Sequence, residues 1–349
     1  MLINKQFALA MFPFILYGSA GYNEKSKYHV LTGERHTYYR ITYNYPYDLS
    51  EDILFIYDVF YESLNPFDPQ STLSKVNNNE EVALDAIFTE AFNRSMELAG
   101  KTKGVFDPTC SPLINLWGFG FKNMEEPSDS LINEIMEYVG YNKVALQNDF
   151  IEKGDSRIQL NFSAIGDGLS CDIIARYLDS KCVNDYMVDI GGEIVTKGKN
   201  GAGSDWSIGI IKPPKYLGID KSFEFEIILR LTGKTAVATS GNYNNYLSQN
   251  GKRYGHTINP QTGYPANNRI LSATVIASDC TTADAYATAI MAIETDKLDE
   301  LLRTNGAMEY YIIYLDEQDN YRIKQSESMN RYGDIFLPTM YPLGHIINK

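Results

Sequence analysis

The chain has 349 residues, of which 44% are hydrophobic and 21% charged, so it can bury a large core and is not a mainly disordered protein. Its formal net charge of -13 produces a field that repels polyanions, which excludes nucleic acid as a main partner. The four cysteines are far apart and form no CxxC pair, so they indicate neither a zinc ribbon nor a redox dithiol.

The N-terminus has the pattern of a secretory signal peptide. Lys5 precedes an apolar run over 7–17, which is shorter than the about 20 apolar residues of a membrane-spanning helix. We expect residues 1–20 to be this signal-like segment and residues 21–349 to form the exported domain, in the periplasm or cell envelope. Ala20 stands where a lipoprotein signal carries its cysteine, so a precursor with cysteine there would be tethered to the inner membrane. The alternative for this segment is a buried N-terminal strand.

The first half of the chain predicts one strand followed by helices. Alternating aromatic and β-branched residues predict a strand over 36–45, and apolar residues at helical spacing predict a long helix over 79–99. A further helix is expected over 126–139. Between these helices, residues 106–121 are apolar but interrupted by proline and glycine, which predicts a buried irregular loop around a short helix.

The second half alternates predicted strands and helices. Residues 157–181 predict a strand, a glycine-containing turn and a helix, an arrangement whose free N–H groups and helix dipole favour phosphate. Residues 186–199 predict strands around a Gly191–Gly192 turn, and further strands and helices follow, the helices starting at Thr282 and Leu298. The fold class we expect is α+β, as a single interwoven domain with mostly antiparallel sheets and packed helices.

Asp284 and Thr288 form a candidate magnesium site. They are four residues apart, so a helix places both on one face, and a carboxylate with a hydroxyl suits a hard cation. The same pair is also explained by an acidic residue that stabilises the helix dipole and a threonine bonded to its own backbone.

His256 is a candidate general base. An imidazole titrates near neutral pH, although a purely structural hydrogen bond in its loop explains the residue equally well. Upstream, Ser240 and Gly241 either bond a ligand or form a turn. The sequence has no G-x-G-x-x-G after a strand, no Walker lysine loop and no G-x-S-x-G elbow, which argues against the common nucleotide sites and a serine hydrolase.

Several segments, taken in chain order over residues 31–325, resemble the motifs of the ApbE family, the FAD:protein FMN transferases. The segments are "FDPTCSPLINLWGFG", "LNFSAIGDG", "MVDIGGEI", "WSIGI", "AVATSGNY", "HTINPQTGYP" and "ADAYATA". The resemblance implies an exported, often lipid-anchored protein with a T-fold-like architecture that binds FAD with Mg²⁺. It also implies transfer of the FMN half of FAD to a Thr or Ser of an acceptor flavoprotein that carries a D-x-[ST]-G-A-[ST]-like segment.

The resemblance also assigns roles to individual residues. It implies that Mg²⁺ is held by the Ala164 carbonyl and the side chains of Asp284 and Thr288. His256 is then the catalytic base, and Asp284 positions the metal. The residues that the resemblance and the local sequence place at the FAD are Phe67, Trp117, Gly118, Phe119, Asn161, Asp167, Ser240, Gly241 and His256.

Four positions depart from the family pattern. His36 replaces a glycine of an N-terminal contact with FAD, and Asn161, Asn242 and Asn259 stand where many members have aspartate. An Asp-to-Asn change removes charge but keeps an acceptor oxygen. Two alternatives to transfer therefore stay open: a FAD pyrophosphatase that gives FMN and AMP, and a FAD-binding envelope protein without turnover.

Overall fold

The structure is a computed structural model that describes residues 28–119, 127–213, 225–241, 257–304 and 308–332, together with the backbone of 246–249 and 252–255. The signal-like segment, Asn242 and His256 lie outside the described residues.

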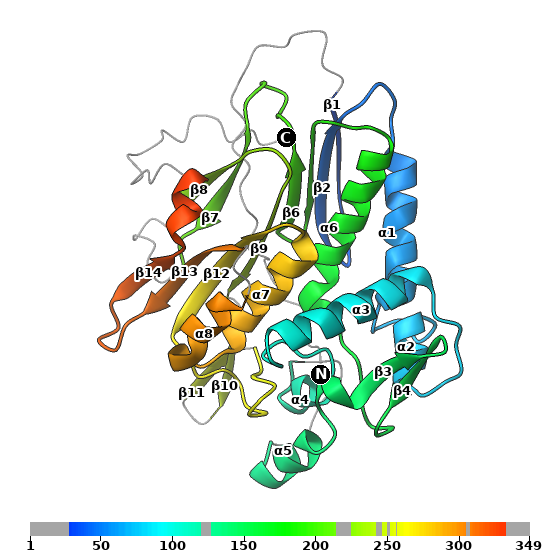
Figure 1. Ribbon diagram of the computed structural model, residues 1–349, viewed down its shortest axis with the longest axis vertical. Helices are drawn as coiled ribbons and strands as arrows, with labels where there is room; N and C mark the ends of the chain where they lie inside the picture. The colour runs from blue at the N-terminus through cyan, green and yellow to red at the C-terminus, as the bar shows by residue number, and fades with distance from the viewer. Residues whose placement is uncertain are drawn as a thin grey trace, which may run out of the picture.

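An eight-stranded antiparallel sheet lies at the centre, in the order β1-β2-β5-β6-β9-β12-β13-β14 (Figure 1). Its strands are β1 (Tyr28–Arg35), β2 (Thr37–Asn44), β5 (Tyr186–Ile190), β6 (Glu193–Lys197), β9 (Thr235–Gly241), β12 (Ile270–Ala277), β13 (Glu309–Leu315) and β14 (Tyr321–Gln325).

Three helices cover one face of this sheet: α1 (Ser50–Leu64), α6 (Ser163–Ser180) and α7 (Cys280–Ala292). Because side chains alternate along a strand, Val188 and Ile190 of β5 pack with α1 and α6, while Met187 points to the other face.

The opposite face is covered by a two-stranded hairpin, β7 (Trp206–Ile211) and β8 (Phe225–Leu231), and by a 3₁₀ turn, η4 (Glu327–Arg331). Trp206, only 1% exposed, packs there and donates from Nε1 to the Lys197 carbonyl at 3.0 Å. The sheet is therefore buried on both faces.

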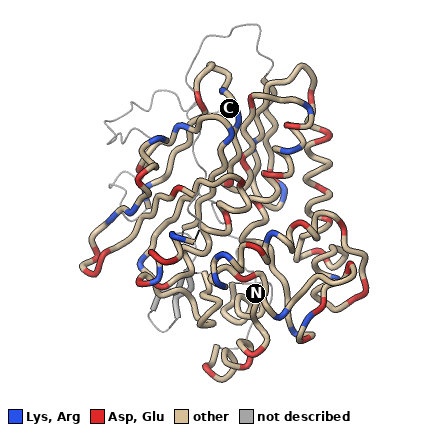
Figure 2. Tube along the Cα trace, viewed as in Figure 1, with Lys and Arg blue, Asp and Glu red and all other residues tan. Residues whose placement is uncertain are grey.

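The remaining elements surround the helical face and the sheet ends (Figure 1). They are α2 (Thr72–Asn77), α3 (Ala86–Lys101), α4 (Ser111–Leu116), α5 (Asp129–Met136), η1 (Tyr141–Lys143), β3 (Val144–Gln147), β4 (Phe150–Lys153), β10 (Tyr246–Gln249), β11 (Lys252–Gly255), η3 (Thr295–Lys297) and α8 (Leu298–Arg303). Acidic and basic residues are interspersed along the described trace rather than gathered by sign (Figure 2), and no described helix has the length and hydropathy needed to span a membrane.

The predicted α+β class with a mostly antiparallel sheet is confirmed, but the start of one predicted helix and one predicted strand with its turn are wrong. The helix expected over 79–99 begins only at Ala86, because the Asp85 side chain accepts the Phe88 N–H at 2.8 Å and starts the helix there. The strand and turn expected after Arg157 are absent from the described structure. Instead α6 begins at Ser163, and its early glycines lie inside the helix.

Candidate functional site

The contact between α6 and α7 is close because Gly168 has no side chain. A Cβ at Gly168 would lie 2.6 Å from the Cys280 carbonyl oxygen and 3.0 Å from the Asp284 Cβ. The Gly168 N–H donates to Asp284 Oδ2 at 3.3 Å. This glycine therefore allows the α7 carboxylate to reach the backbone of α6.

The three predicted magnesium ligands occupy this helix pair. Asp284 is 6% exposed, and Thr288 is half-buried one turn further along α7, with its hydroxyl bonded to no other described residue. Ala164 lies in the first turn of α6. In a regular helix its carbonyl faces the N–H of Gly168, which is the same N–H that donates to Asp284. The helix geometry thus brings a carbonyl and a carboxylate oxygen to one place.

Two further buried carboxylates, those of Asp167 and Glu193, interact electrostatically with Asp284. A Cβ on Gly191 would lie 2.4 Å from Asp167 Oδ2 and 3.1 Å from Glu193 Oε2, and the φ of Gly191 is 67°. Only glycine fits here at low free-energy cost, because it has no Cβ to collide with these carboxylates and readily adopts a left-handed backbone. We call Asp167, Glu193 and Asp284 the acid cluster.

The electrostatics of the acid cluster fit a bound cation. Burial, and then the charges of Asp167 and Asp172, hold the pKa of Asp284 well above its ordinary value. Burial raises the pKa of Asp167 to about 7, and burial with the neighbouring carboxylates raises the pKa of Glu193. A cation offsets such crowded negative charge, and Mg²⁺ prefers oxygen ligands. No three His, Cys, Asp or Glu side chains in the described ranges form a metal-binding group, but the predicted set contains only one such side chain.

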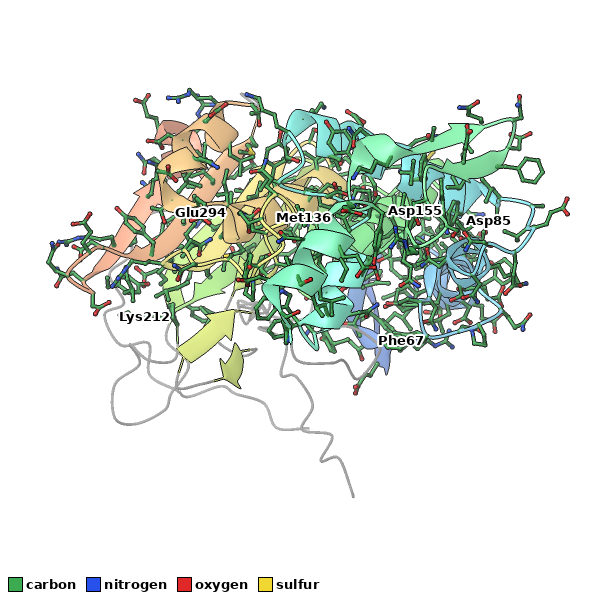
Figure 3. The ribbon with its side chains drawn as sticks, turned by 90° about the horizontal axis from the view of Figure 1, so that it is seen from below. Phe67, Asp85, Met136, Asp155, Lys212 and Glu294 are labelled. Atoms are coloured by element: carbon green, nitrogen blue, oxygen red, sulfur yellow. The ribbon has the colours of Figure 1, made fainter. Side chains whose placement is uncertain are left out.

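The predicted flavin-contacting residues are partly aromatic and partly exposed. Phe67, on the loop between α1 and α2 (Figure 3), is 71% exposed and offers a ring face for stacking. Trp117 is 7% exposed and donates from Nε1 to the Gly263 carbonyl at 2.8 Å. Gly118 is exposed with a φ of 76°, and Phe119 is half-buried against the same cluster as Trp117.

The polar predicted residues have local roles in this structure. Asn161 Oδ1 accepts the Ser163 N–H at 2.7 Å, so the amide keeps the acceptor function that aspartate would have at the start of α6. Asn259 Oδ1 likewise accepts the Gln261 N–H at 2.9 Å. Ser240 and Gly241 are half-buried at the end of β9, and their contact with FAD stays a prediction.

His36 occupies a position whose backbone suits glycine. Its φ is 57°, which explains why a glycine is expected there. The imidazole stacks on Tyr61, with ring centroids 4.0 Å apart. Burial and then the charge of Asp167 raise the pKa of Tyr61. The His36 ring therefore contacts a tyrosine that is influenced by the charge of Asp167.

The sequence reasoning missed Glu193 and the neighbouring Asp189, which is also buried. The available signal was the segment "VDIGGE", in which two acidic residues flank a Gly-Gly turn between apolar strands. Acidic residues in such strands need a partner or a function.

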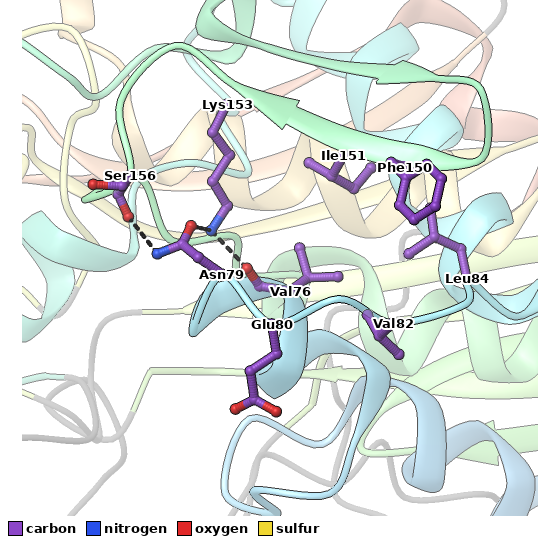
Figure 4. A pocket seen from close by; sticks show the side chains of 9 residues that line it. All are labelled: Val76, Asn79, Glu80, Val82, Leu84, Phe150, Ile151, Lys153 and Ser156. Carbon is purple, nitrogen blue, oxygen red and sulfur yellow. Dashed lines mark hydrogen bonds between the residues drawn. The ribbon is translucent and has the colours of Figure 1, made fainter.

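A pocket between α2 and β4 is separate from these residues (Figure 4). Its lysine, Lys153, donates to the Val76 carbonyl at 2.7 Å and to Asn79 Oδ1 at 3.0 Å. Burial lowers the pKa of Lys153 to about 8, but these acceptors at the C-terminal end of α2 favour its charged form. Lys153 is thus a structural helix cap.

The family profile that matches this chain is that of the ApbE family, over residues 36–312. The chain belongs to the ApbE family. Its ApbE relatives include the FAD:protein FMN transferase of Vibrio cholerae serotype O1, 36% identical over 68% of this chain and 70% of that protein. The FAD:protein FMN transferase of Escherichia coli K12 is 30% identical over 76% of both chains.

Solved ApbE structures share the fold. The flavin transferase ApbE from Vibrio cholerae superposes with a TM-score of 0.77 and 30% identity, covering 88% of this chain and 99% of that one. The apo flavinyl transferase ApbE of Pseudomonas stutzeri gives a TM-score of 0.77 at 26% identity, covering 88% of this chain and 96% of that one.

Proposed function

We propose that this ApbE protein is an FAD:protein FMN transferase that moves the FMN half of FAD to a Thr or Ser of an acceptor flavoprotein. The acceptor oxygen forms a bond to the FMN phosphorus, the bond between the two phosphates breaks, and AMP leaves with the bonding electrons. The observation that carries this proposal is the α6–α7 junction, where the buried Asp284 accepts the Gly168 N–H of α6.

The predicted site residues would have two kinds of role, ligand binding and proton transfer. Ala164, Asp284 and Thr288 are the groups that would hold Mg²⁺, which when bound neutralises charge on the diphosphate. His256, whose role rests on sequence alone, would take the proton of the attacking hydroxyl. The exposed ring of Phe67 would stack on the flavin.

The acceptor and compartment belong to the same proposal. The acceptor would be an exported flavoprotein subunit with a D-x-[ST]-G-A-[ST]-like segment. The signal-like residues 1–20 support action in the periplasm or cell envelope.

The test is an incubation of the full chain with FAD and Mg²⁺, with and without an acceptor polypeptide that carries this segment. Mass spectrometry of the acceptor and chromatography of the nucleotides follow the products. A mass increase equal to FMN, with AMP released, supports transfer. Free FMN and AMP with an unlabelled acceptor indicate a pyrophosphatase, and FAD binding without AMP indicates a protein without turnover.

A further inference from the structure

Asp172 lies two turns after Ala164 on α6 and contacts the start of α7. Its side chain is 8% exposed, Oδ1 accepts the Cys280 N–H at 2.9 Å, and Oδ2 accepts the Thr281 N–H at 2.9 Å. Oδ2 also accepts the Thr281 hydroxyl at 2.6 Å. The first N–H groups of a helix have no partner within it, and here a carboxylate from a different helix supplies one.

The second residue that caps the start of α7, Asp279, connects this helix to α3. Asp279 accepts the Thr282 N–H at 2.8 Å and pairs with Arg94 of α3 at 2.9 Å. Asp172 is therefore the cap that links the start of α7 to α6.

We propose that Asp172 is a positioning residue that fixes α7 against α6 and so sets the place of Asp284 and Thr288 relative to Ala164. This rests on the proposed function, since it assumes that these three residues hold Mg²⁺. The bonds from Asp172 to α7 lie about one turn before Asp284. A shift or rotation of the start of α7 would therefore move the side chains of Asp284 and Thr288. Mg²⁺ tolerates little such movement, because it requires near-ideal octahedral geometry.

Two variants separate position from charge. Asp172→Asn removes the negative charge, whereas Asp172→Glu keeps it and moves the carboxylate by one methylene. A positioning role predicts that both weaken Mg²⁺ binding, by about ten-fold or more, as is typical when groups that orient metal ligands are changed. A role through charge alone predicts wild-type affinity for Asp172→Glu.

The matched control is Asp85→Asn. Asp85 likewise starts a helix and ties it to others, accepting the Phe88 N–H at 2.8 Å, the Ser63 hydroxyl at 2.8 Å and the Thr72 hydroxyl at 2.6 Å. It holds α3 rather than α7.

The measurement is a calorimetric Mg²⁺ titration of the full chain, with and without FAD. Weaker binding in both Asp172 variants, with wild-type affinity in the Asp85 variant, supports the inference. Wild-type affinity in Asp172→Glu, or equal loss in the Asp85 variant, overturns it. If either Asp172 variant does not fold, Thr281→Val removes one bond to Asp172 without changing charge, and an unaltered affinity there overturns the inference instead. Absence of Mg²⁺ binding by the wild type refutes the proposed function itself.

Discussion

At Asp284 the demands of folding and of chemistry oppose each other. A buried carboxylate whose pKa is raised by burial and by neighbouring charges destabilises the metal-free protein at neutral pH. A cation bound to Asp284 would offset this loss of stability.

We therefore predict that Asp284→Asn raises the melting temperature of the metal-free protein at pH 8 while FMN transfer falls by ~100-fold or more. The variant should also lose stabilisation by added Mg²⁺. Calorimetric melting and the transfer assay measure these effects. Asp299→Asn, at an exposed carboxylate of α8 that pairs with Lys324, should leave FMN transfer and the stabilisation by Mg²⁺ unchanged. Full transfer by Asp284→Asn would refute the metal assignment.

The role of His256 predicts a change in pH dependence. A general base is active when unprotonated, so wild-type kcat/KM should rise with pH through the titration of an imidazole, normally near about 6.5. His256→Ala should have lower activity and lack this rise. Rates measured between pH 5 and pH 9 test this, and a variant with the wild-type profile would exclude the histidine as base.

Asp189 gives a prediction that does not depend on catalysis. Burial raises its pKa from 3.8 to about 7, against the opposing effects of the Gly192 N–H and Arg40, and its Oδ1 bonds to no described residue. Because the folded state holds this proton more tightly, the associated stability is complete below pH 3.8 and is lost as the pH rises through about 7. Asp189→Asn should remove this loss.

Urea unfolding at pH 5 and pH 8 measures the effect. The wild type should lose more stability than Asp189→Asn over this range, with an upper bound of about 3 kcal/mol. Parallel losses in the two proteins would mean that Asp189 is ionised in the folded state.

At the scale of elements, the α6–α7 contact depends on one of two nearby glycines in α6. A Cβ at Gly168 would meet the Cys280 carbonyl, whereas a Cβ at Gly166 meets nothing within 4 Å. We predict that Gly168→Ala destabilises the fold by ~1–3 kcal/mol and impairs Mg²⁺ binding. Gly166→Ala, in the same helix, should be neutral or stabilising by up to about 1 kcal/mol. Denaturant unfolding compares them, and equal behaviour of the two variants would contradict the close contact.

The site around this contact shows which features could be predicted from the sequence and which could not. Spacing alone placed Asp284 and Thr288 on one helix face, and alternation predicted the antiparallel sheet. Neither pattern shows that Gly191 allows Asp167 and Glu193 to approach, because that contact joins segments distant in the chain. The start of α3 was missed for a local reason: the cap formed by Asp85 outweighed the helical pattern before it.

At the scale of the molecule, the sheet separates the proposed site from the hairpin on its other face. Sheets and the layers packed on them are about 10 Å apart, so changes on the two faces should be nearly independent. Trp206 and Gly168 lie on opposite faces of this sheet.

We predict that Trp206→Phe costs ~1–3 kcal/mol, because it loses volume and the hydrogen bond to the Lys197 carbonyl, without changing Mg²⁺ affinity. When Trp206→Phe is combined with Gly168→Ala, the two losses in the free energy of unfolding should add within about 0.5 kcal/mol. The double-mutant cycle is measured by urea unfolding at pH 5, where the wild type is expected to be more stable. A larger coupling energy would show that the sheet transmits strain between its faces, so that the hairpin side of the molecule also tunes the α6–α7 junction.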